Sequence, residues 1–61
     1  MSAKRKVKDA LGAVEDALCA LSRAAQAAPS EPNIARTIRE LWDAETLLQR
    51  AVREVGRLES P

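Results

Sequence analysis

The sequence contains no histidine, one cysteine and one aromatic residue, Trp42, among its 61 residues. One cysteine cannot close a disulfide within the chain, and a single thiol without histidine cannot provide the ligand set of a structural zinc site. We therefore expect no metal and no cofactor. Because very small domains usually depend on disulfides, metals or assembly, a chain of this length is expected to need oligomerisation or a binding partner.

Long apolar runs are also absent. A membrane-spanning helix needs about 20 consecutive apolar residues, and the longest run here is far shorter. The basic start is not followed by an apolar core, since Asp9, Glu15 and Asp16 interrupt it, so we expect no signal peptide and no membrane partner. The unpaired thiol of Cys19 suits a reducing compartment, and we expect a cytoplasmic protein.

Groups that support catalysis are equally scarce. The sequence has no histidine, no glycine-rich phosphate loop and no nucleophile with a base in evident reach. Two helices also cannot enclose a pocket of ordinary ligand size. We therefore expect a protein that is not an enzyme and that has no small-molecule substrate.

The sequence is rich in alanine, leucine, glutamate and arginine, and 46% of its residues are apolar, which is the composition of a helical protein. Apolar residues recur at alternating steps of four and three from Val7 to Ala28. They are Val7, Leu11, Val14, Leu18, Leu21, Ala25 and Ala28. This spacing predicts the seam of a coiled-coil-like helix. Gly12 is either a weak point of that helix or a sign of close backbone approach.

A second seam follows with the same spacing. It comprises Ile34, Ile38, Leu41, Glu45, Leu48, Val52 and Val55, and Gly56 is expected near the end of its helix. Pro29 must end the first helix, and Ser30 is the preferred N-cap of the second, with Asn33 as the alternative. The short connection predicts one domain over 1–61, an all-α antiparallel two-helix hairpin with helices at about 4–28 and 31–58 and a turn at 28–33.

Each helix carries a second apolar row beside its seam, which one partner helix cannot cover. We therefore expect two hairpins to dimerise into a four-helix bundle, or one hairpin to bind another helical protein. The predicted interface residues are Ala10, Ala17, Ala24, Trp42, Ala44, Leu47, Ala51 and Leu58. As the only aromatic residue, Trp42 is either packed between subunits or exposed as an anchor for a partner.

Glu45 interrupts the second seam. It is either a ligand for a metal, a proton or a cationic group, or a polar residue that fixes register and oligomer number. A third interpretation is that it reaches an arginine at the edge of the seam. The absence of any Glu-x-x-His pair disfavours the metal.

The first eight residues carry four positive charges, while the remainder carries a net charge of −3. Cations at a helix start oppose the helix dipole, so residues 1–6 are expected to be a frayed basic terminus. Such a terminus is either a solubilising segment or a contact for nucleic acid. The possible nucleic-acid contacts are Lys4, Arg5, Lys6 and Lys8. The arginines of the second helix alternate with acids at i, i+4, which predicts a solvated face.

Two resemblances follow from these features. The length and the antiparallel hairpin resemble plasmid copy-number regulators, which dimerise into four-helix bundles and bind RNA loops. The stretch from Leu41 to Thr46, Leu-Trp-Asp-Ala-Glu-Thr, is similar to a Trp-x-x-Glu-Ser stretch in type III secretion needle co-chaperones. The favoured hypothesis is a helical-hairpin interaction protein that self-associates, with a dimer favoured, or that serves as an adaptor or small chaperone. A nucleic-acid-binding regulator and a needle co-chaperone-like protein are the alternatives.

Overall fold

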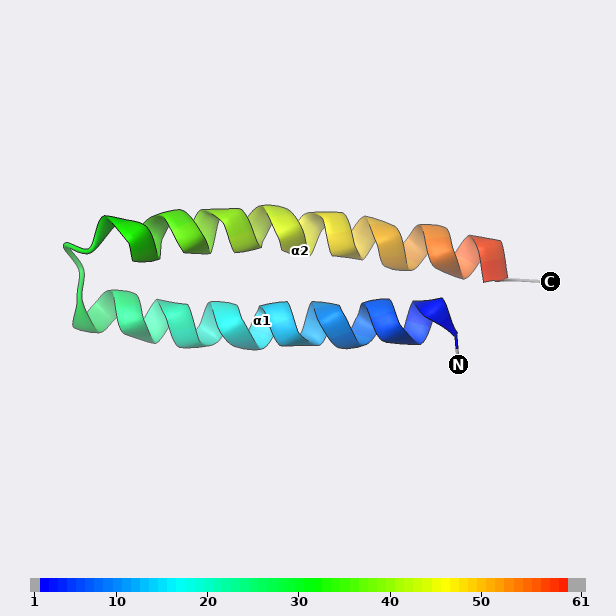
Figure 1. The fold of residues 1–61 in the computed structure, drawn as a ribbon, viewed down its shortest axis with the longest axis horizontal. Coiled ribbons are helices and arrows are strands. Elements are labelled where there is room, and N and C mark those ends of the chain that lie inside the picture. The colour runs from blue at the N-terminus through cyan, green and yellow to red at the C-terminus, as the bar shows by residue number, and fades with distance from the viewer. Residues whose placement is uncertain (1, 60–61) are drawn as a thin grey trace.

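The protein, described by a computed structural model for residues 2–59, folds into two helices. α1 spans Ala3–Ala27 and α2 spans Pro32–Glu59. They lie side by side and antiparallel, with both chain ends at one end of a rod and the turn at the other (Figure 1). The rod measures 50 × 16 × 10 Å. The predicted all-α helical hairpin is confirmed, and each helix boundary lies within one residue of its expected position. Neither helix combines the length and the apolar character needed to cross a membrane.

The turn forms for the expected reason but is capped differently. Ala28 has φ −136° and ψ 67°, outside the helical region, because Pro29 follows it. The predicted caps Ser30 and Asn33 were both wrong. Since α2 begins at Pro32, the residue directly before the helix is Glu31, and its Oε1 accepts the N–H of Asn33 at 3.0 Å. A carboxylate in this place also complements the positive end of the helix dipole.

α1 begins at Ala3 and so includes most of the segment expected to fray, while Met1 lies outside the described residues. The Oγ of Ser2 accepts the N–H of Arg5 at 3.1 Å. At the other end of the chain, Glu59 accepts the N–H of Ala3 at 2.9 Å and that of Lys4 at 3.4 Å. The first turn of α1 has no acid of its own, so α2 supplies the carboxylate that its positive end favours.

These terminal contacts fix the register of the hairpin. With Ala3 opposite Glu59, the pairing places Val7 across from Val55 and Leu21 across from Leu41. The seam residues are half-buried for the most part, and Leu18 alone, at 8% exposure, is buried. The core is therefore one layer of side chains between two helices.

The two glycines differ in surroundings. A Cβ added at Gly12 would meet no atom within 4 Å, so this glycine does not mark a close backbone approach within the hairpin. Gly56 lies near the end of α2, as expected, and the helix continues for three more residues to Glu59. Neither glycine has a positive φ, so neither forms a left-handed cap.

We expect Gly12→Ala to raise the free energy of unfolding by about 1 kcal/mol, because alanine loses less backbone entropy in a helix and finds free space here. The measurement is urea unfolding followed by circular dichroism at one protein concentration. The reverse change at the exposed neighbour, Ala13→Gly, should lower stability by a similar amount. A less stable Gly12→Ala would contradict the open surroundings of this residue.

Candidate interaction surface

The hairpin exposes more surface than a compact protein of its mass. Its accessible area is 4834 Å². A globular monomer of 6.6 kDa would expose about 3,900 Å². The difference, about 900 Å², is close to the roughly 800 Å² that each partner buries in a standard protein–protein interface. A second chain on one face would therefore bring the exposure of each hairpin to that of a compact protein.

A continuous apolar surface, which we call the alanine face, lies along one side of the seam. It is formed by two rows of α1 and one row of α2, together with Leu47, whose own row is otherwise acidic, with Glu40 and Glu54 seven residues to either side. Its members are Ala10, Ala13, Ala17, Ala20, Ala24 and Ala27 of α1, with Ala44, Leu47, Ala51 and Leu58 of α2. In an antiparallel helix pair, the row beside the seam of one helix lies next to the equivalent row of the other helix, on the same side of the hairpin. Accordingly, the members nearest the seam are half-buried, namely Ala17, Ala24, Ala44 and Ala51, and the other members are exposed.

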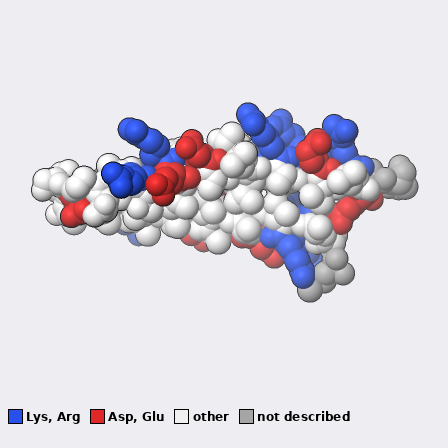
Figure 2. Space-filling view, turned by 45° about the horizontal axis from the view of Figure 1, so that its top comes forward, with Lys and Arg blue, Asp and Glu red and all other residues white. Residues whose placement is uncertain are grey.

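Charged side chains lie at the edge of this surface, where Glu40 and Glu54 flank Leu47. The space-filling view shows an uncharged band along much of the rod, with Lys, Arg, Asp and Glu gathered at its edges (Figure 2). Leu47 is 62% exposed and Leu58 is 84% exposed. Single exposed leucines are ordinary, but two of them beside rows of alanine indicate a contact site.

Trp42 lies on the other side of the seam. It shares its row with Gln49 and Gly56, each seven residues further on, and Gly56 lines a groove on that side. The eight predicted interface residues are thus divided: seven belong to the alanine face, and Trp42, at 56% exposure, does not. Trp42 was predicted as an interface residue because it lies next to the seam, without a distinction between the seam's two flanks.

Glu45 is half-buried in the seam of α2. Within residues 2–59 it forms no ion pair or hydrogen bond, so the structure does not show the predicted reach to an arginine. The one ion pair in that range joins Arg57 Nη1 to Glu54 Oε2 at 3.1 Å. The role of Glu45 in setting register and oligomer number remains a prediction.

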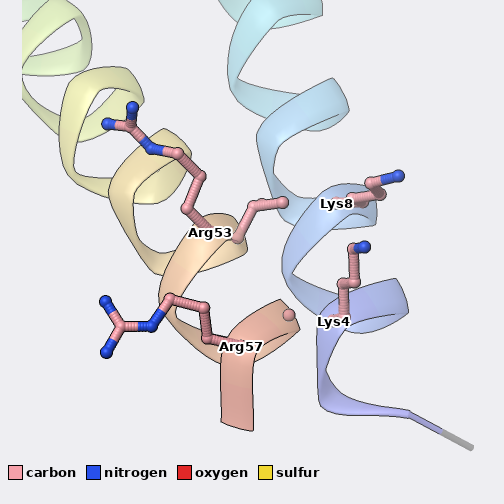
Figure 3. A pocket seen from close by; sticks show the side chains of 6 residues that line it. Lys4, Lys8, Arg53 and Arg57 are labelled. Atoms are coloured by element: carbon pink, nitrogen blue, oxygen red, sulfur yellow. The ribbon is translucent and has the colours of Figure 1, made fainter. Parts of the chain in front are cut away.

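The basic terminus combines with arginines of α2. Lys4 and Lys8 from α1 and Arg53 and Arg57 from α2 line an open groove, which we call the basic groove (Figure 3). Its remaining lining comes from Val52 and Gly56. The other two predicted nucleic-acid contacts, Arg5 and Lys6, are exposed but do not line it. Sequence reasoning missed Arg53 and Arg57 because it judged α2 alone; the antiparallel register is the signal that places them beside Lys4 and Lys8.

Charge is divided along the rod. The terminal half, residues 1–13 and 49–61, contains seven lysines and arginines and three acids, a net charge of +4. The turn half, residues 14–48, contains three arginines and six acids, a net charge of −3. The two ends of the hairpin therefore carry net charges of opposite sign.

We expect Glu45→Leu to raise the free energy of unfolding by about 1 kcal/mol, because it adds apolar area to a half-buried seam position. It should also broaden the distribution of oligomeric states, because a polar seam residue restricts register. Urea unfolding and light scattering after size exclusion measure the two effects. The exposed control Asp43→Leu, on the outer face of α2, should leave the unfolding energy nearly unchanged; a destabilised Glu45→Leu would indicate that the carboxylate makes a necessary contact.

No protein-family model matches the chain, and neither the curated proteins nor the solved structures contain a significant match to it. The functional argument therefore depends on the two surfaces of the hairpin: the alanine face on one side of the seam and the basic groove on the other.

Proposed function

We propose that this protein is a non-enzymatic helical-hairpin interaction protein of the cytoplasm, and that a second copy of the chain covers its alanine face to form a four-helix bundle. The observation that carries this proposal is the alanine face, an apolar surface that the hairpin leaves largely exposed. Burying such a surface is favourable by about 25 cal/mol per Å² of apolar area.

The shape of the alanine face supports a helical occupant. Small side chains allow helix axes to approach to about 8 Å, at the short end of the range for packed helices. Leu47 lies near the middle of α2 and projects from this surface, while Leu58 lies near its end. Around a two-fold axis through the middle of the face, two copies of Leu47 would meet near the axis, and each Leu58 would reach the alanines near the partner's turn.

Charge favours an antiparallel pairing of the two hairpins. In that arrangement the terminal half of each copy, with a net charge of +4, lies beside the turn half of the other, with −3. A parallel arrangement would place like-charged halves side by side, which is unfavourable. The bundle we propose is therefore an antiparallel homodimer.

The same face would accept an amphipathic helix of another protein, which is the adaptor or small-chaperone form of the proposal. The similarity of the stretch from Leu41 to Thr46 to the needle co-chaperones belongs to this form. The exposed Trp42 of that stretch lies on the other side of the seam, so it would be a separate contact for such a partner. No metal or cofactor is part of either form.

We expect Leu47→Glu to convert the dimer to a monomer, raising its dissociation constant by at least about 100-fold, because a buried unpaired charge at an interface costs several kcal/mol. The control is Gln49→Glu, which adds the same charge at an exposed position of the same helix, on the other side of the seam. Light scattering after size exclusion measures the mass. A wild-type chain that is a folded monomer at micromolar concentration would rule out self-association and leave the adaptor form.

We expect spin labels on Ser30→Cys, in a Cys19→Ala background, to lie about 40 Å apart in the dimer, because the two turns are separated by about one helix length, 25 residues of α1 at a rise of 1.5 Å per residue. Pulsed electron paramagnetic resonance measures this distance. Parallel hairpins would bring the labels within about 20 Å, since packed helices lie 8–10 Å apart. A short distance would therefore contradict the antiparallel pairing while leaving the dimer itself intact.

A further inference from the structure

The basic groove concentrates the positive charge of the molecule where it has little counter-charge. Its four cations come from both helices, and the lysines of α1 are almost fifty residues away in sequence from the arginines of α2. The acids of the terminal half are Asp9, Glu54 and Glu59. Glu54 pairs with Arg57, while Glu59 accepts the backbone N–H groups at the start of α1. Asp9 is exposed and does not line the groove.

The cationic head groups do not converge on one point. In the close view Lys4 and Lys8 extend on the α1 side of the groove, while Arg53 and Arg57 extend on the α2 side, away from the lysines (Figure 3). The stem of Lys4 rests over Gly56, where its Cε lies 3.5 Å from the position that a Cβ would occupy. Such a spread does not suit one small anion, which needs donors directed at a common centre. It suits an elongated polyanion that contacts the cations in succession.

The spacing of the cations fits a strand of phosphates. Lys4 and Lys8 are one helical turn apart, as are Arg53 and Arg57, so each pair is separated by about 6 Å along its helix. In a duplex each strand carries one charge per about 3.4 Å of axis, so phosphates recur more closely than the two cations of one wall. A strand that contacts both walls can therefore present a phosphate to all four cations.

We propose that the basic groove binds the phosphodiester backbone of single-stranded nucleic acid, through charge and without reading its sequence. Nothing in this proposal requires the alanine face, because the groove lies on the other side of the seam and stays open in a dimer. A bilayer surface fits less well. Membrane-bound helices insert apolar side chains among their cations. The uncharged residues that line this groove, Val52 and Gly56, are half-buried, and the exposed Leu58 belongs to the opposite side.

The test is fluorescence anisotropy of a labelled DNA strand of about 20 nucleotides titrated with the full chain at about 50 mM salt, where phosphate contacts are strong. Binding should weaken with salt with a log–log slope of about −3, since each of four neutralised phosphates on a single strand contributes about −0.7. Strands of different base composition should bind alike.

Two variants of equal net charge locate the site. Lys8→Gln/Arg53→Gln removes two groove cations, and we expect a loss of affinity of about 10-fold or more and a salt slope nearer −1.5. Arg36→Gln/Arg39→Gln removes two exposed cations of the turn half and should change affinity less than about 3-fold. All four side chains are exposed, and circular dichroism confirms that both variants remain helical.

Several results would overturn the proposal: no anisotropy change at low salt, equal losses in the two double variants, equally strong competition by a polyglutamate peptide, or tighter binding to anionic vesicles than to DNA. Leu47→Glu separates this inference from the proposed function. It should remove self-association and leave the groove's affinity for the strand in place, whereas loss of both would place the strand on the alanine face.

Discussion

When only two helices pack together, each can bury just one face against the other, and the rest of this structure depends on that limit. The stripe here is a single layer of aliphatic side chains in which Leu18 alone is buried. A core this thin leaves about half of the surface of the extended chain exposed, which is more than an isolated domain of this size normally leaves. The apolar rows beside the seam are consequently needed for stability, although they are not buried within one hairpin. They are where the additional burial that a small domain needs can be obtained.

The sequence predicted the architecture well because its strongest patterns are local. Steps of four and three define each seam, and Pro29 ends the first helix whatever surrounds it. The cap of α2 was misjudged because three polar residues compete for one role, and the position of Pro32 decides between them. Residues 3–6 form part of α1 because Ser2 and Glu59 together satisfy N–H groups that the local sequence appeared to leave without acceptors.

The candidate surfaces were less predictable, since they depend on which rows meet across the hairpin. The alanines of α1 and the leucines of α2 could be assigned to one surface from spacing alone, but Trp42 could not be excluded from it. The arginines of α2 alternate with acids along the chain and so resemble a neutral solvated face. In space, Arg53 and Arg57 lie next to lysines of α1, and the local sign of charge changes. Both differences arise from the antiparallel register, which no single helix encodes.

The contact between Glu59 and the first residues of α1 has a further consequence. It holds the described ends of the chain within hydrogen-bonding distance, at the same end of the rod. A segment whose entry and exit points adjoin can be grafted into the surface loop of a host protein without stretching the host's backbone. This hairpin therefore has the geometry of an insertable helical rod that would project some 50 Å from the host's surface.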